Sequence, residues 1–262
     1  MIQLGRIILR SLFLRSLITN FVFIPSAIAH EDNLQANKSS PKMYLHLVTE
    51  EYPPLNMISN EGVITGLATE LLRLAAENNS IELQIELLPW KRAYQIALKQ
   101  PSTCIYSAWR TTEREKLFHW VGPLANDAWS FFALKNRNIQ ILSKKDTHHY
   151  RVGSIDGWAF TQYLQKQQHP YLDLIHIEDE TNARKLQSGR IDLWATGRIS
   201  GHQIIKQQKI LDIEEVFAVR EIGLWLACNT DTDPKIIHDL QNALDQFERD
   251  GTARKIRATF KF

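Results

Sequence analysis

Hydrophobic and polar residues alternate along the chain in two rhythms, one typical of strands and one typical of helices. Ile81, Leu83, Ile85 and Leu87 alternate with polar residues, as in a half-buried strand. In residues 65–78 the hydrophobic positions recur at helical spacing instead. Strands are expected at residues 43–49, 81–87, 103–108, 150–155, 172–177, 191–196 and 222–229, and helices at 65–78, 90–99, 158–167 and 181–188. This order predicts α/β layers with a mainly parallel sheet.

A further helix is expected near the end of the chain. Asp233 is a suitable N-cap residue, and Pro234 fits the first helical turn. The hydrophobic face of this helix would consist of Ile236, Ile237, Leu240, Leu244 and Phe247.

Ligands of α/β sheets bind beyond the carboxyl ends of the strands, so two strand ends are candidate sites. Tyr52 follows the first strand, and Pro53 and Pro54 would hold it in place as the wall of a pocket. The alternative is an ordinary strand exit with a half-buried tyrosine. Trp90 follows another strand and could line a cleft, although a core tryptophan is the commoner outcome.

The densest group of polar residues, Ser107 to Arg114, follows the strand expected at 103–108. Thr112 and Glu115 fit a capping box, which predicts a short helix here. The free N–H groups of its first turn, with Arg110 and Arg114 beside them, would bind an anion, and arginine can hold a carboxylate through two hydrogen bonds. The alternative is a surface helix whose arginines pair with the neighbouring glutamates.

The N-terminus resembles an export signal. Three arginines precede and enter an apolar run over residues 17–28, which ends in Ala27-Ile28-Ala29, a small-residue cleavage pattern. A retained membrane anchor is the alternative, but the run is short and interrupted for a span. Cleavage after Ala29 would leave a soluble protein in an oxidising space outside the cytoplasm, and residues 30–42 of that protein are expected to form a flexible terminus.

Charge and composition narrow the function classes. The chain has 31 basic and 29 acidic residues, and removal of the signal leaves 28 against 29. This balance argues against nucleic-acid binding.

Cys104 and Cys228 permit one disulfide in an exported chain, but two buried thiols are equally compatible with their apolar surroundings. No metal-ligand spacing is present, since His148-His149 is a lone pair, and no cofactor motif or catalytic motif is found.

At this point the mature chain resembles the bacterial extracellular solute-binding proteins of family 3. The resemblance rests on short motifs in order: Tyr52-Pro53-Pro54-Leu55, Gly62, Gly66-Leu67, Arg110 to Arg114, Phe118 to Leu124, Val152-Gly153, Gly157, Gly189-Arg190-Ile191-Asp192 and Asp250-Gly251-Thr252. It implies a two-lobed type II periplasmic binding protein fold, a ligand cleft between the lobes and two crossover strands at 129–134 and 221–227.

The resemblance also implies lobe boundaries and partners. Lobe 1 would comprise residues 43–133 plus 223–262, and lobe 2 residues 134–222. A small polar, carboxylate-bearing ligand would be captured by a monomer and delivered to a membrane ABC permease. Such a protein is not an enzyme and needs no cofactor.

Site residues are carried over from the family one by one. Arg114 matches the arginine that clamps the ligand carboxylate, and Arg110 lies beside it. Ser107 and Trp109 match neighbouring contact positions, and Tyr52 matches the aromatic that packs over the ligand.

In the second lobe, Gly157 and Trp158 match a helix start that caps the same carboxylate. The family usually has an aspartate for the ligand amine at the position of Gly197, and Arg198 follows here. This departure favours an amine-free ligand, unless another acid substitutes; the candidates are Glu50, Glu51 and Asp156.

Two other functions remain open on the same fold. One is a ligand-sensing module without a transporter. The other is a dehydratase-like enzyme, for which Glu50, Glu51 and His202 are candidate acid–base groups by location.

Overall fold

The computed structural model describes residues 43–260. The predicted signal sequence and the segment 30–42 lie outside these residues. The strands are β1 Met43–Thr49, β2 Met57–Ile58, β3 Ile64–Thr65, β4 Ile81–Leu87, β5 Thr103–Trp109, β6 His119–Leu134, β7 Val152–Gly153, β8 Leu172–Asp173, β9 Leu193–Gly197 and β10 Ile213–Cys228. The α-helices are α1 Leu67–Asn78, α2 Trp90–Lys99, α3 Ala159–Lys166, α4 Asp179–Gln187, α5 Arg198–Gln208, α6 Pro234–Asp250 and α7 Thr252–Phe260. Helices and strands alternate as the hydrophobic pattern predicts.

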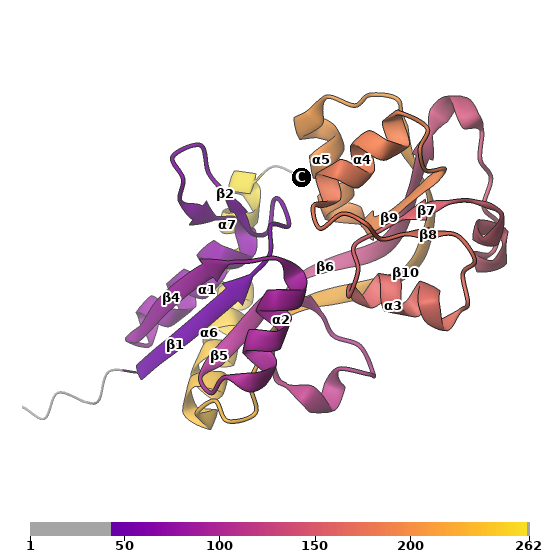
Figure 1. Cartoon of the computed structure of the whole chain (residues 1–262). Coiled ribbons are helices and arrows are strands. Elements are labelled where there is room, and N and C mark those ends of the chain that lie inside the picture. Colours follow the sequence, from indigo (N-terminus) through magenta and orange to yellow (C-terminus); the bar gives the residue numbers. More distant parts are fainter. Residues whose placement is uncertain (1–42, 261–262) are drawn as a thin grey trace, which may run out of the picture. The chain divides into compact units, whose positions relative to one another are not determined.

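Eight strands form one sheet in the order β4-β1-β5-β10-β6-β9-β7-β8 (Figure 1). Pairing is parallel towards both ends of this sheet, where β1 pairs with β4 and β5, and β7 pairs with β8 and β9. The pairs β5–β10, β10–β6 and β6–β9 in the middle are antiparallel. The sheet is therefore mixed rather than mainly parallel. Strand–helix alternation predicts the outer parallel units but not the antiparallel return of β10.

Strands β6 and β10 join the two ends of the sheet. Each has 16 residues, and they pair from Ile213 with Leu134 to Cys228 with His119, with three irregularities in register. Both expected crossover segments lie within this pair. β10 begins nine residues before the expected start at Ile222, because Glu214, Arg220 and Glu221 are exposed and hide the strand alternation.

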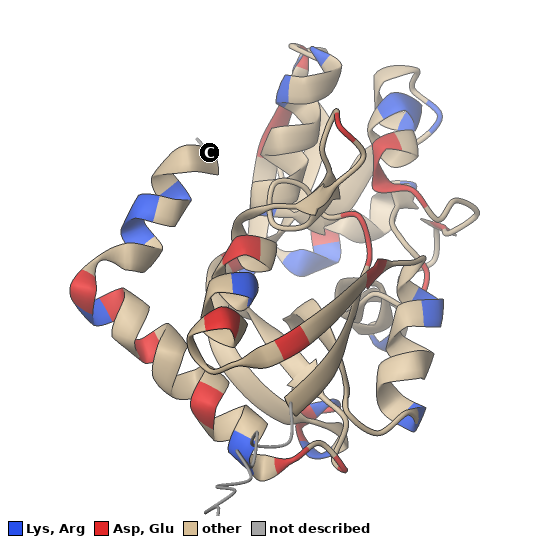
Figure 2. Cartoon of the chain, turned by 90° about the vertical axis from the view of Figure 1, so that its left-hand side faces the viewer, with Lys and Arg blue, Asp and Glu red and all other residues tan. Residues whose placement is uncertain are grey.

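Helix α6 forms as its sequence predicts. The Asp233 side chain accepts a 2.8 Å hydrogen bond from the backbone N–H of Lys235, and Pro234 occupies the first turn. Of the expected face, Ile236, Leu240, Leu244 and Phe247 are buried, and Ile237 is partly buried against the core. Helix α6 carries both acidic and basic residues, whereas the charged residues of α7 are all basic (Figure 2). Helix α6 therefore packs by its apolar stripe.

The prediction of a short helix starting at Thr112 is wrong. The structure has only a 3₁₀ turn at Glu115–Leu117, with no side-chain cap. Glu115 accepts two hydrogen bonds from Arg110 instead of reaching back to a cap residue. A single 3₁₀ turn is too short to supply the predicted anion site at a helix N-terminus.

The two cysteines are joined in a disulfide between β5 and β10, where Cys104 and Cys228 face each other in register. Both are fully buried. Of the two alternatives that the sequence left open, the structure has the disulfide, as suits an exported chain. Within residues 43–260, no helix is both long and apolar enough to span a membrane.

Candidate functional site

The backbone brings four aromatic residues together from four places in the sequence. Tyr52 follows β1, Trp90 begins α2, Trp109 ends β5 and Trp158 precedes α3. The rings of Trp109 and Trp158 lie 5.6 Å apart edge to face, and the Tyr52 ring is 6.0 and 5.7 Å from them. All four side chains are buried, Tyr52 more deeply than the half-buried strand exit would require.

These rings enclose a small space, here called the tryptophan cavity. Its lining consists of Glu50, Tyr52, Trp90, Ser107, Trp109, Trp158 and Ala159. Its volume is about 10 Å³, enough for about one water molecule. Four of the predicted ligand-binding residues, Tyr52, Ser107, Trp109 and Trp158, therefore line one cavity.

Two polar atoms in this lining have no hydrogen-bond partner among the described residues: Ser107 Oγ and Trp109 Nε1. Both residues are more than nine-tenths buried. Ser107 also has φ +56°, in the left-handed region that few residues with side chains adopt. A buried donor without a partner costs about 1–3 kcal/mol, so two of them beside one cavity point to a ligand that would bond to them.

Arg114 lies beside the cavity and is 3% exposed. Its Nη1 donates to the Trp109 carbonyl at 3.5 Å, and its Nη2 donates to the Gly157 carbonyl at 3.2 Å and to Gln162 at 3.4 Å. The guanidinium also stacks 5.1 Å from the Trp90 ring. Its Nε has no partner among the described residues. Burial lowers the pKa of Arg114, yet this charge meets only neutral acceptors.

The Gly157 turn joins this cluster from the other end of the sheet. Gly157 has φ +86°, and its carbonyl also accepts a 2.9 Å hydrogen bond from Trp90 Nε1. The next residue, Trp158, donates from Nε1 to Glu50 Oε2 at 3.0 Å. Residues 50–114 and residues 157–162 therefore meet through hydrogen bonds around the cavity.

Arg110 and Arg198 do not line the tryptophan cavity. Arg110 makes two hydrogen bonds to Glu115, of 2.8 and 2.6 Å, as in the surface alternative. Arg198 pairs with Glu215 at 3.0 Å and with Glu221 at 2.9 Å. Because two carboxylates neutralise Arg198, its charge gives no reason to expect an acidic ligand.

The Gly197 position is filled by other side chains. Tyr52 donates from its hydroxyl to Asp127 Oδ2 at 2.9 Å. A Cβ atom on Gly197 would lie 1.6 Å from that hydroxyl and 2.5 Å from Asp127 Oδ2. The other carboxyl oxygen of Asp127 accepts from the backbone N–H of Ala128 and Ile199. Sequence reasoning did not single out Asp127, which lies 75 residues from its tyrosine partner.

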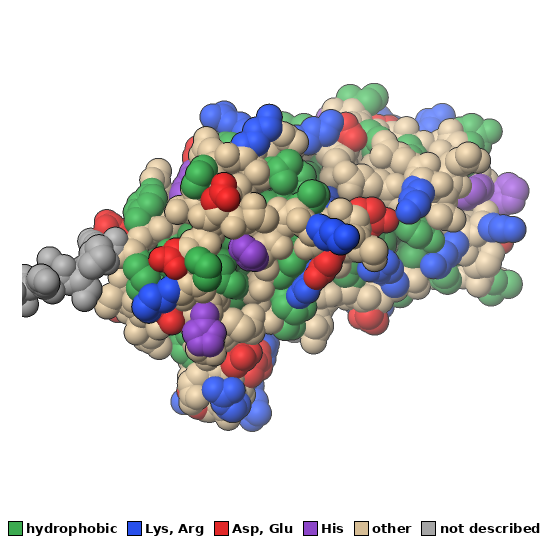
Figure 3. All heavy atoms as spheres, turned by 90° about the horizontal axis from the view of Figure 1, so that it is seen from below, with side chains coloured by type: hydrophobic (Ala, Val, Ile, Leu, Met, Phe, Trp, Pro, Cys, Tyr) green, Lys and Arg blue, Asp and Glu red, His purple; other side chains and the backbone are tan. Residues whose placement is uncertain are grey.

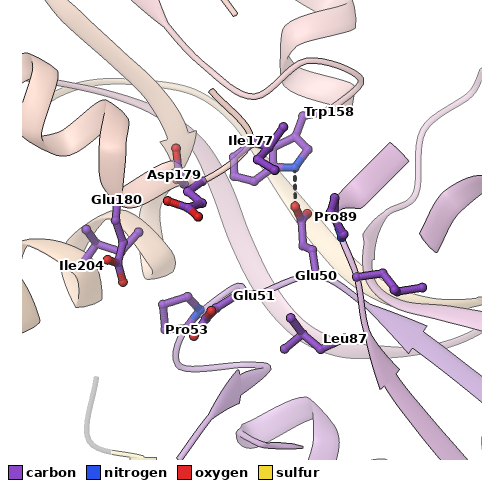
Figure 4. Close-up of a pocket in the computed structure, with 12 residues that line it drawn as sticks. Glu50, Glu51, Pro53, Leu87, Pro89, Trp158, Ile177, Asp179, Glu180 and Ile204 are labelled. Atoms are coloured by element: carbon purple, nitrogen blue, oxygen red, sulfur yellow. Dashed lines mark hydrogen bonds between the residues drawn. The ribbon is translucent and has the colours of Figure 1, made fainter. Parts of the chain in front are cut away.

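A second, larger pocket shares Glu50 and Trp158 with the cavity and has a volume of about 380 Å³. Its carboxyl-bearing residues are Glu50, Glu51, Glu178, Asp179 and Glu180, and it is called the acidic pocket below. Figure 4 shows Glu50 bonded to Trp158 on one wall, with Asp179 and Glu180 reaching in from α4. The one sequence signal for the three acids at 178–180 is a run of carboxylates at the start of a helix.

Burial changes the acidity of two groups in this pocket. Burial raises the pKa of Glu50 to about 8, against the hydrogen bond from Trp158; Asp179 raises it further and Arg114 lowers it. Burial raises the pKa of Asp179 to about 6, although Thr196, Trp194 and Asn182 donate to it. A positive ligand group would stabilise the charged form of Glu50.

The remaining acid–base candidates lie elsewhere. His202 Nε2 is 3.3 Å from Glu215, and Asp156 pairs with Lys91. Among residues 43–260, no group of three or more His, Cys, Asp or Glu side chains could hold a metal ion. His148 packs its ring 5.0 Å from the His169 ring.

Comparison with known proteins identifies the family of this chain. The family model of the bacterial extracellular solute-binding proteins, family 3, matches residues 45–261. The chain belongs to this family. As a family 3 protein it binds a small-molecule ligand, and the tryptophan cavity is the candidate place. No curated protein matches the chain.

Solved structures show the same type II periplasmic binding protein fold at low sequence identity. A histidine kinase sensor domain with similarity to periplasmic binding proteins has a TM-score of 0.77 and 17% identity, over 84% of this chain and 97% of that one. An ABC uptake transporter substrate-binding protein from Streptococcus pneumoniae with bound histidine has a TM-score of 0.74 and 13% identity, over 83% of this chain and 92% of that one. The GluR0 ligand-binding core from Nostoc punctiforme with L-glutamate has a TM-score of 0.72 and 18% identity, over 83% of this chain and 99% of that one.

Proposed function

We propose that this family 3 protein captures a small polar, carboxylate-bearing solute, an amino acid or a related organic acid, in the periplasm. It delivers this solute as a monomer to a membrane ABC permease and does no chemistry on it. The observation that carries the proposal is the tryptophan cavity, where the buried Ser107 hydroxyl and Trp109 indole N–H lack partners beside a buried arginine. The structures with bound histidine and bound glutamate support an amino-acid-like ligand.

The surroundings of Arg114 support a ligand that carries a carboxylate. Its three hydrogen bonds are long, between 3.2 and 3.5 Å, and all go to neutral oxygens. A carboxylate would replace them with shorter, charge-assisted bonds and would also reach the free Nε. Ligand binding would therefore exchange weak acceptors for a strong one.

We also propose that the two lobes move apart to admit the ligand. A space of about 10 Å³ cannot hold an amino acid, so the walls must separate before a ligand enters. With lobe 1 at residues 43–133 plus 223–262 and lobe 2 at 134–222, the contacts Trp90–Gly157, Glu50–Trp158 and Lys91–Asp156 all cross between lobes. Rotation about β6 and β10 would break them together.

The first test is native mass spectrometry of protein purified from the periplasm, followed by calorimetry with amino acids and matching carboxylates. We expect one small polar molecule bound per chain. Arg114→Ala should weaken its binding by about 2–5 kcal/mol, whereas Arg190→Ala, which changes an exposed arginine, should not. A dissociation constant unchanged in Arg114→Ala would exclude the arginine as the anchor.

A sensing role is the second candidate, favoured by the likeness to a histidine kinase sensor domain. The two roles separate in a strain that lacks this protein. Loss of uptake of the identified ligand supports transport, and intact uptake with a lost transcriptional response supports sensing. The dehydratase-like alternative predicts turnover, so nuclear magnetic resonance of the bound ligand after incubation should show it unchanged.

A further inference from the structure

We propose that Glu50, with the aromatic rings around it, binds the positively charged amine of the ligand in place of the acid that is missing at Gly197. This inference rests on the proposed function and narrows its ligand class. The ligand is then a zwitterion or a cationic amino acid rather than an amine-free acid.

Among residues 43–260, Glu50 is the only carboxyl-bearing residue that lines both the tryptophan cavity and the acidic pocket. Two of the other nearby acids have strong partners of their own. Asp179 accepts from Trp194 at 2.7 Å and from the Thr196 hydroxyl, and Asp156 pairs with Lys91. Of the acids that could substitute at Gly197, Glu50 is therefore the one placed beside the unpartnered donors.

The rings around Glu50 suit a cation. Tyr52, Trp90, Trp109 and Trp158 line the same cavity, and faces of tryptophan and tyrosine attract ammonium groups within about 6 Å of the ring centre. Trp158 also donates to Oε2 and so fixes the carboxylate against its own ring. An ammonium group would meet a carboxylate and aromatic surface at one point.

The acidic pocket selects against a second negative charge. Five of its described lining residues carry a carboxyl group and none is basic. Elsewhere, as on the face in Figure 3, acidic, basic and hydrophobic side chains are interspersed, so this one-sign lining is a local feature. A ligand with a neutral or positive side chain fits the pocket, and one with a second carboxylate is repelled.

Proton release distinguishes this contact from mere filling of space. The charged groups that act on Glu50 are Arg114, which lowers its pKa, and Asp179, which raises it; with burial the pKa is about 8. At pH 7 Glu50 is mostly protonated, and a bound ammonium favours the carboxylate. Ligand binding at pH 7 should therefore release up to about one proton.

Calorimetry with three probe pairs tests the inference: L-arginine and 5-guanidinopentanoate, L-glutamine and glutaramate, and L-glutamate and glutarate. The members of each pair differ only in the amine. We expect arginine or glutamine to bind tightest and its deaminated partner to bind at least about 30-fold more weakly. Comparison of phosphate and Tris buffers should show the released proton.

Glu50→Gln should weaken the binding of the amine-bearing probe at least about 30-fold and abolish proton release. The affinity for the deaminated partner should not change. Glu214→Gln makes the same change at an exposed carboxyl outside both pockets and should alter none of these values. Trp158→Phe keeps a ring but removes the N–H bonded to Glu50, and should change the amount of proton released.

Failure of the Glu50 contact and failure of the proposed function give different results. Tight binding of a deaminated acid or of glutarate, with Glu50→Gln like the wild type, overturns this inference and leaves the proposed function standing. No binding of any probe, together with no co-purified molecule, overturns both.

Discussion

Tyr52 and Asp127 are joined by a buried 2.9 Å hydrogen bond from the tyrosine hydroxyl to the carboxyl Oδ2. Burial raises the pKa of both groups. Since Asp127 also accepts from two backbone N–H groups, this pair ties the end of β1 to β6 and to the start of α5. It occupies the space that a side chain at position 197 would need.

The first prediction concerns Gly197. Its φ of −73° suits any residue, so Gly197→Ala should act through the clash of the new Cβ with the Tyr52 hydroxyl. We expect a loss of about 1–3 kcal/mol in the free energy of unfolding, measured in urea. In a Tyr52→Ala background the same change should cost clearly less. Equal costs in both backgrounds would contradict the steric account.

The second prediction concerns Ser107. Because its hydroxyl has no partner among the described residues, Ser107→Ala should leave the free energy of unfolding unchanged or raise it. Affinity for the co-purified ligand should fall by about fivefold or more, as expected for one lost hydrogen bond.

Ser154 is the matched control for Ser107. It is also buried, but it donates to the Ala195 carbonyl at 2.9 Å and accepts from Thr161. Ser154→Ala should therefore destabilise the protein by about 1–3 kcal/mol. A destabilised Ser107→Ala variant with unchanged affinity would show that Ser107 has only a structural role.

The third prediction is a pH dependence of stability. The folded protein holds the Glu50 proton up to a pKa of about 8, against an ordinary value of 4.5, and the Asp179 proton up to about 6, against 3.8. The stability gained from these protons is fully present below pH 4 and is lost as pH rises through 6 and then 8. Urea unfolding from pH 5 to 8 should show a fall on the order of a few kcal/mol.

Glu50→Gln separates the two groups. In this variant the decline above pH 6 should flatten, because only the Asp179 part, below pH 6, remains. An identical decline above pH 6 in both proteins would assign it to another group.

The fourth prediction concerns the disulfide. The bond links residues 124 positions apart, so reduction should free a long loop in the unfolded chain. We expect reduction to lower the free energy of unfolding by about 2–5 kcal/mol. Cys104→Ala/Cys228→Ala should be insensitive to the reductant. If thiol titration shows full reduction without a change in stability, the disulfide does not stabilise the fold.

Local patterns predicted the elements whose residues carry their own signals. The alternation at 81–87 and the Asp233-Pro234 start gave β4 and α6. The strands β7 and β8 are two residues long, shorter than the apolar runs around them, and α5 was not predicted because few of its residues are hydrophobic. The type II fold itself came from resemblance, because no local signal shows that β10 returns beside β5 and β6.

The candidate site was predictable in part. Tyr52, Ser107, Trp109 and Trp158 were expected in one site and do line one cavity. The Tyr52–Asp127 bond and the acids at 178–180 depend on which strand ends meet, and residue spacing does not contain that information. For the same reason the acidic charge of the larger pocket was not foreseen, nor were Glu215 and Glu221 as partners of Arg198, which was interpreted as a second cation near the site.

The most direct test of the account is a crystal structure with the amino acid that binds tightest by calorimetry. The account predicts ligand density between the rings of Trp109 and Trp158, with the carboxylate on Arg114 and the amine on Glu50. Density at any other surface, with the tryptophan cavity still closed and Arg114 still bonded to the Gly157 carbonyl, would contradict it.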